Sequence, residues 1–291
     1  MSSELIHINE LAHACYERGE YERAAELWLR LVRAHLGNGG DNPGRELAAA
    51  GSRCIWAARA YLATGDSAAA ESAGSLAVSL LEEADGPQEW LLEAHAHLAK
   101  THHTAGNVEQ CAHHIYAVAY AELRLFRAED AATSLARIVV PLDGSAPPSL
   151  VSRASADLSL LRSALAVADP AWWTTGSWKQ IAAAIVGNHP SLVGAREALE
   201  DAVGSELAEG MSDAQLENFE QLMEDDALAL DWLQENAPDA RAVTDRHLSR
   251  IVACVLLAEP DTAADLGAER THGDQGKRST TTDTKAQGEK S

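Results

Sequence analysis

The stretch HINELAHACYERGEYERAAELWLRLVRAHL, His7 to Leu36, decides the fold of this chain. On either side of Gly19, apolar and small residues recur at the spacing of one helix face. Glycine can turn the chain with a positive φ at no steric cost, and the following Glu20 can cap the next helix by accepting its free amide hydrogens. The stretch therefore predicts two helices that fold back on each other at a tight turn.

The same pattern occurs twice more, in CIWAARAYLATGDSAAAESAGSLAVSLL around Gly65 and in HAHLAKTHHTAGNVEQCAHHIYAVAYAEL around Gly106. Asp66 and Asn107 follow these glycines as possible helix caps. Counted outward from each glycine, small or apolar residues recur at three inward positions: Leu11, Ala57 and Leu98; Ala12, Ala58 and Ala99; Ala24, Ala70 and Cys111. The sequence thus predicts three consecutive helical hairpins.

The whole chain is predicted to be all-α, because alanine and leucine dominate and no long Val/Ile/Thr alternation is present. The segment DGSAPPS, Asp143 to Ser149, has the composition of a linker. We expect a helical-hairpin repeat domain over residues 1–142 and an acidic all-helical domain over 149–268. The polar, threonine-rich residues 269–291 are expected to form a disordered tail.

Charge and composition restrict the partners and the location of the chain. The net charge of −21 argues against nucleic acid and against anionic membranes, both of which require basic surfaces, and favours a basic partner. No leader peptide and no run of about 18 apolar residues is recognisable, so we expect a soluble, cytoplasmic protein. The four cysteines lack CxxC spacing and are expected to be free thiols: Cys15, Cys54, Cys111 and Cys254.

The hairpin pattern resembles the tetratricopeptide repeat (TPR) family, whose units are helical hairpins with a Leu-small pair, a Gly-acidic-aromatic turn and a small residue early in the second helix. The first repeat carries these features at Leu11, Ala12, Tyr16, Gly19, Tyr21, Ala24 and Trp28. The second and third repeats carry Ser67 and Val108 where the turn aromatic is expected. The glycines lie 46 and then 41 residues apart, whereas the family repeats every ~34 residues, so longer helices or loops must separate the hairpins. The resemblance covers roughly the first 120 residues, and a more general helical-hairpin solenoid is the alternative.

The resemblance implies that the first helices of successive hairpins line a groove for an extended peptide or a partner helix. The residues that it places there are Asn9, His13 and Glu17, then Trp56 and Arg59, then Glu93, His97, Lys100 and His103. Trp56 would dominate binding if it is exposed, because Trp and Arg are enriched at interface hot spots; otherwise it would pack into the next hairpin. These side chains do not match the family's clamp for a C-terminal carboxylate, which uses a set of Lys, Arg and Asn.

The stretch THHTAGNVEQCAHHIY, Thr101 to Tyr116, is rich in histidine, and a metal site is one interpretation of it. Zinc needs three or four convergent ligands, and the hairpin register brings only His102 and Cys111 together. We expect His103, His113 and His114 to point to other faces. The sequence therefore assigns no metal, and no cofactor motif is present.

The second part of the chain offers three further signals. Ser177 to Leu199 has helix-turn-helix spacing at Ala183, Gly187 and Val193, but its second helix carries only Arg196 against several carboxylates. Residues 197–240 contain fourteen acidic residues and no Lys or Arg, a pattern that is typical of a solvated face and less often of a docking surface. Within this block, Ser212 and Gln215 have the spacing of a capping box at the start of a helix. The apolar residues of that helix fall on one stripe: Leu216, Phe219, Met223, Ala227 and Leu230. One loop contains three tryptophans, Trp172, Trp173 and Trp178, which either pack over the helical core or form an exposed recognition patch.

No motif of a phosphate loop, dinucleotide site, zinc peptidase or serine hydrolase is present, so no catalytic residue is assigned. The sequence favours a protein-protein interaction module: an adaptor, assembly factor or regulator with a TPR-like groove. The alternatives are a helix-turn-helix transcriptional regulator with a TPR-like sensing domain, and a helical toxin or immunity component. The sequence leaves the oligomeric state open.

Overall fold

We describe a computed structural model that covers residues 3–37, 42–140, 146–166, 176–222, 232, 236–237 and 239–259 of the chain. Every regular element in these residues is helical, as the sequence predicts. The residues group into two compact units, 1–163 and 164–291, each of which is described by itself. This division falls within the eighth helix, whereas the linker composition predicts a boundary just before it. The expected tail, 269–291, lies outside the described residues.

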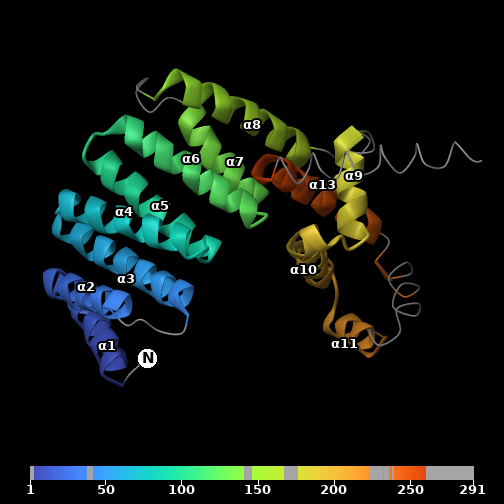
Figure 1. Cartoon of the computed structure of the whole chain (residues 1–291). Helices are drawn as coiled ribbons and strands as arrows, with labels where there is room; N and C mark the ends of the chain where they lie inside the picture. Colours follow the sequence, from blue (N-terminus) through green and yellow to red (C-terminus); the bar gives the residue numbers. More distant parts are fainter. Residues whose placement is uncertain are drawn as a thin grey trace, which may run out of the picture. The chain divides into compact units, whose positions relative to one another are not determined.

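The first unit is a stack of helices that follow one another in sequence order, from blue to green in Figure 1. Its helices are α1 (Ser3–Glu17), α2 (Tyr21–Gly37), α3 (Pro43–Thr64), α4 (Ser67–Glu83), α5 (Gln88–Thr104), α6 (Val108–Arg124), α7 (Ala128–Val139) and α8 (Pro148–Ala166). From α1 to α7, each helix packs against the next. The predicted hairpins are therefore α1/α2, α3/α4 and α5/α6.

The hairpin turns have the predicted geometry. Gly19, Gly65 and Gly106 all adopt positive φ, between 73° and 81°. The amide after each glycine bonds back to the preceding helix, as Asp66 N does to the Tyr61 carbonyl at 3.0 Å. Asp66 and Asn107 cap their helices through side-chain oxygens, whereas Glu20 instead binds Arg18 Nε at 2.7 Å and does not act as the predicted cap.

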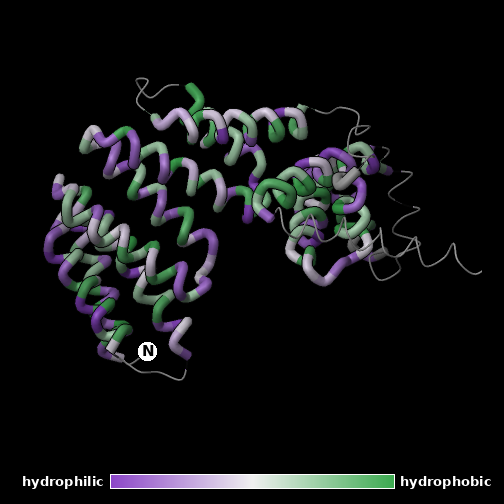
Figure 2. Tube along the Cα trace, turned by 45° about the horizontal axis from the view of Figure 1, so that its top comes forward, coloured by the Kyte–Doolittle hydropathy of each residue, from purple (hydrophilic) through white to green (hydrophobic). Residues whose placement is uncertain are grey.

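Small inward side chains let the helices of each hairpin approach closely. Eight of the nine predicted inward positions are at most 6% exposed, and Leu11 is half-buried against the same core. The unusual 46-residue spacing between the first two turns comes from α3, which is 22 residues long, and from the link before it. Figure 2 shows hydrophobic and hydrophilic residues alternating along these helices, the pattern of helices that bury one face.

Side chains join the first helices of the three hairpins. Within the described residues α3 packs against α5, whereas α1 with α3, α2 with α4 and α4 with α6 do not make contacts of that extent. His13 on α1 nevertheless contacts Trp56 on α3, so we call the face shared by α1, α3 and α5 the inner face; the predicted partner-binding residues lie on these helices.

Replacing Gly65 with alanine should lower the free energy of unfolding by about 1–2 kcal/mol, because a φ of +81° strains any residue that carries a Cβ. No atom lies within 4 Å of that Cβ position, so the loss comes from the backbone and not from a clash. Gly65→Asn should lose less, since asparagine tolerates this conformation. Urea unfolding of the three proteins checks the order, and equal stability of all three would contradict it.

The second unit contains α9 (Gly176–Val186), the 3₁₀ turn η2 (Pro190–Leu192), α10 (Val193–Glu209), α11 (Asp213–Leu222) and α13 (Ala240–Ala258). Its core lies where α13 packs against α10 and α9, around buried residues such as Ile185, Leu192, Leu199 and Val252. In the described part of the chain, no helix is both long and apolar enough to cross a membrane.

Candidate functional site: the face formed by the first helices

Side chains from three hairpins join on the inner face of the first unit. The ring of His13 on α1 lies edge-on to Trp56 on α3, with centroids 4.8 Å apart. The guanidinium of Arg59 lies over the same indole, 4.5 Å from its centroid, which is cation-π geometry. Arg59 Nε then donates a hydrogen bond of 2.8 Å to His97 Nε2 on α5. These contacts run without a break from the first hairpin to the third.

Glu93 on α5 completes this face by forming an ion pair with Arg59, while its carboxylate lies 3.8 Å from His97 Nε2. Arg59 and Glu93 are each 31% exposed, so the pair is reachable from solvent but held in place. We name the set of His13, Trp56, Arg59, Glu93 and His97 the α1/α3/α5 surface.

Three buried polar atoms on this face lack a hydrogen-bond partner among the described residues: Asn9 Oδ1, His97 Nδ1 and Glu93 Oε1, the last of which lies in the ion pair with Arg59. His97 Nε2 accepts from Arg59, which leaves Nδ1 as the donor position of this ring. Buried polar atoms are nearly always hydrogen-bonded in native proteins, so these three are unsatisfied positions beneath the surface and not exposed contact groups.

The aromatic part of the surface is anchored in the core. Trp56 is half-buried and stacks on Trp28, with centroids 5.4 Å apart, while Trp28 itself is fully buried on α2. Tyr16 contacts both indoles. Burial lowers the pKa of His13, and the nearby charge of Arg53 lowers it further, so this ring is neutral at pH 7. Trp56 thus combines the two roles considered for it: one part packs inward and the rest faces solvent.

Three predicted residues stand apart from this network. Glu17, Lys100 and His103 are exposed, and no described side-chain hydrogen bond, ion pair or ring contact connects them to the surface. The structure therefore brings together five of the residues placed on this face, buries the side-chain oxygen of Asn9 without a described partner, and leaves three residues at the solvent edge. Sequence reasoning named Tyr16 and Trp28 only as repeat-signature residues and did not assign them, or Arg53, to the support of this surface.

The histidines of α5 and α6 form a cluster of their own, and one sequence prediction about them is wrong. His114 does not point away: its Nδ1 lies 3.2 Å from His95 Nδ1, and its ring stacks on the buried His102 with an angle of 3°. Metal ions bind a histidine nitrogen in the plane of the ring, so two parallel stacked rings cannot aim at one point. Among the described residues no group of three or more His, Cys, Asp or Glu has the geometry to hold a metal.

The predicted helix-turn-helix is a helical corner with different packing from that expected. Val193 is 43% exposed, and Ala183 also faces solvent. The residues buried at this corner include Leu192 and Ala195. The 3₁₀ turn η2 advances three residues per turn and so changes which face of the following helix turns inward. Arg196, the one cation of the predicted second helix, binds Glu200 at 2.7 Å and the carbonyl of Val186 at 3.2 Å.

Half of the predicted capping box forms at the start of the acidic helix. Gln215 Oε1 accepts from the amide of Ser212, but the Ser212 hydroxyl donates to the same oxygen and does not accept from the Gln215 amide, which bonds to the Ser212 carbonyl. Within the block, Glu206 pairs with Arg246 and with His247 Nε2, the latter at 2.7 Å, and so joins α10 to α13. Met223, Ala227, Leu230, Trp172 and Trp173 lie outside the described residues, as does the side chain of Trp178.

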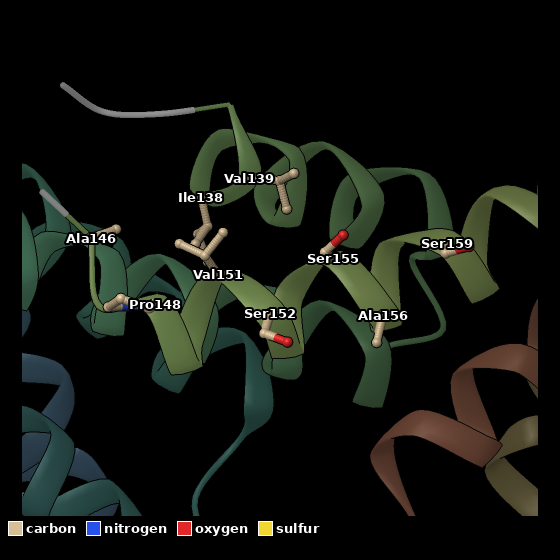
Figure 3. A pocket seen from close by; sticks show the side chains of 9 residues that line it. All are labelled: Ile138, Val139, Ala146, Pro148, Val151, Ser152, Ser155, Ala156 and Ser159. Carbon is tan, nitrogen blue, oxygen red and sulfur yellow. The ribbon is translucent and has the colours of Figure 1, made fainter. Parts of the chain in front are cut away.

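Each unit also contains a hollow that the sequence did not predict. In the first unit, an open groove of about 840 Å³ separates the end of α7 from α8. Figure 3 shows Ile138 and Val151 meeting at one end of it and Ser152, Ser155 and Ser159 spaced along α8. Its described lining has hydroxyls but no charged group, so it provides no acid, base or anion-binding residue. In the second unit, a cavity of about 340 Å³ lies between α10 and α11.

Residues 190–255 match the model of DUF5663, a family described as a protein of unknown function. The match covers η2, α10, α11 and most of α13, and it does not reach the first unit. No curated protein and no solved structure matches the chain.

Proposed function

We propose that the chain is a cytoplasmic protein-binding module, an adaptor, assembly factor or regulator, that holds a partner peptide or protein on the α1/α3/α5 surface. The observation that carries this proposal is the unbroken set of contacts from His13 through Trp56 and Arg59 to His97. It lies on the first helices of three hairpins, where the resemblance to tetratricopeptide repeats expects a partner.

The chemistry of this surface is that of a binding site. Trp and Arg are the side chains most enriched at binding hot spots, and here the core stack under Trp56 and the ion pair of Arg59 with Glu93 hold both in place before a partner arrives. The net charge of −21 favours partners with basic segments near the surface.

DNA binding by the second unit has less support. The affinity of proteins for DNA rests largely on free Lys and Arg at phosphates, and Arg196 is already held by Glu200 and a carbonyl. If this chain were a DNA-binding regulator, Arg196→Ala would reduce a salt-sensitive mobility shift of duplex DNA. We expect no shift with the intact chain, even at low ionic strength.

The double substitution Trp56→Ala, Arg59→Ala should abolish capture of the partner, because it removes the aromatic and the cation at the centre of the surface. The test is affinity capture from native lysate with intact and substituted chains, followed by mass spectrometry. Circular dichroism checks that the variant is folded. Arg33→Ala, which removes an exposed arginine from α2, is the matched control. A protein lost only from the double variant supports the proposal, and identical sets of proteins would remove this surface from consideration.

A further inference from the structure

The cavity of the second unit follows α10 along most of its length. Two neighbouring rows of this helix line it, Leu199, Val203 and Leu207 in one and Glu200, Gly204 and Ala208 in the other, with Met211 just beyond the end of the helix. At 1.5 Å per residue, the lining on α10 from residue 199 to 208 spans about 14 Å, and Met211 extends it, so the cavity corresponds to about three turns of a helix lying alongside.

The opposite wall is also apolar. Leu216 and Phe219 of α11 face the cavity, and the ring of Phe219 contacts Trp232 at 5.4 Å. Apart from Glu200 and Thr244, every described lining residue is apolar or glycine, and Val203, Leu207, Met211 and Phe219 are only half-buried. A contiguous, partly exposed apolar surface of this kind is typical of an interaction site.

The rim of the cavity is strongly acidic. Five carboxylates lie on α10 and three on α11, against one arginine, Arg196, whose charge is paired with Glu200. The exposed Glu197 and Asp213 each lie one turn before a lining residue, Glu200 and Leu216, and form the rim together with the exposed Glu200. An apolar surface inside an acidic rim is complementary to a helix that has one apolar face and lysine or arginine on its flanks.

We propose that the cavity between α10 and α11 is a docking site for a basic amphipathic helix of about three turns. The apolar side chains of that helix enter between the two rows of α10 and the wall of α11, and its cations meet the carboxylates of the rim. All described lining residues fall within the segment that matches DUF5663, so the site belongs to that segment. It is separate from the α1/α3/α5 surface and does not depend on it.

Gly204 gives a direct test, because a Cβ added there meets no atom within 4 Å and the position lines the cavity. Gly204→Leu should fill the cavity with the protein's own side chain, and replacing glycine inside a helix should not weaken α10. Ser205→Leu, the same new side chain at the exposed neighbouring position outside the cavity, is the matched control. The probe is a fluorescein-labelled 18-residue helix of leucine and lysine, with a leucine and glutamate helix as its counterpart.

By fluorescence anisotropy with the full chain, we expect the lysine helix to bind and the glutamate helix not to bind. Gly204→Leu should weaken binding at least tenfold, and Ser205→Leu less than twofold. Glu197→Lys with Asp213→Lys should also weaken it at least tenfold. The same charge change in the first unit, Glu71→Lys with Glu83→Lys on exposed sites of α4, should leave it within twofold.

Several outcomes would overturn the proposal: absence of binding, equal binding of both helices, equal affinity of the Gly204 and Ser205 variants, or equal effects of the two charge reversals. Equal charge effects would mean that the probe responds only to the net charge of the chain. The double variant Trp56→Ala, Arg59→Ala should bind the lysine helix as the intact chain does, so failure of this site and failure of the α1/α3/α5 surface are distinguishable.

Discussion

Replacing Trp28 with alanine is expected to lower the free energy of unfolding of the first unit by about 3–5 kcal/mol. Trp28 is completely buried on α2, and its indole contacts His13 and Tyr16 of α1 and Trp56 of α3. The substitution would leave a cavity between the first two hairpins and remove the support under the α1/α3/α5 surface. Since domains are typically stable by only about 5–15 kcal/mol, the loss would be a large part of the total.

Trp28→Phe is the matched control for this prediction. It keeps an aromatic ring in the stack and removes the Nε1 hydrogen, which has no acceptor among the described residues, so we expect a loss of about 1–2 kcal/mol. Urea unfolding followed by circular dichroism measures both variants. Equal stability of Trp28→Ala and the intact chain would show that the ring stack does not hold the hairpins together.

The second large effect is a loss of stability in mild acid, caused by the histidine cluster of α5 and α6. Burial lowers the pKa of His114 to about 4, and the neighbouring His95, His102 and His113 lower it as well. The unfolded chain, with an ordinary histidine pKa near 6.5, therefore binds more protons than the folded chain between about pH 6.5 and 4. Stability must fall as pH decreases through this window, by about 2 kcal/mol after allowance for solvent screening of a partly buried ring.

Comparison of His114→Phe with the intact chain isolates this effect, because phenylalanine keeps a ring against His102 but does not titrate. We expect urea unfolding at pH 7 and at pH 4.5 to show a smaller loss of stability in the variant. His103→Phe changes an exposed position on α5, and between pH 7 and pH 4.5 this variant should lose as much stability as the intact chain does. An unchanged pH dependence in His114→Phe would contradict this account of the cluster.

Most of the first unit could be predicted because its determinants are local. A glycine with positive φ and small residues at fixed distances from the turn define each hairpin, and a following cap is added in the second and third. Gly65, Asp66 and Ala70 have these roles in the second hairpin. The same register could also have revealed the histidine cluster. Leu98 and Cys111 occupy inward positions on facing helices, so His95 and His114, each three residues farther from the turn, should also meet.

Other features depend on contacts between distant segments and had no local signal. The stack of Trp28 on Trp56 joins α2 to α3 of the next hairpin, and its position is set by the angle between hairpins. In the second unit, one 3₁₀ turn was enough to bury Leu192 and expose Val193, so a spacing rule based on regular helices chose the wrong residue. The cavity of α10 and α11 requires three-dimensional packing, although its half-buried Leu216 and Phe219 belong to the predicted apolar stripe.

Binding of a partner by the α1/α3/α5 surface is tested most directly by the affinity of one captured partner for three forms of the chain. The forms are the intact chain, Arg59→Ala and Arg33→Ala, each titrated by calorimetry. Arg59 lies at the centre of the surface in contact with Trp56, Glu93 and His97, whereas Arg33 is an exposed arginine on α2. We predict that Arg59→Ala binds at least tenfold more weakly and that Arg33→Ala binds as the intact chain does. Equal affinities of the two variants would contradict the assignment of this surface to the partner.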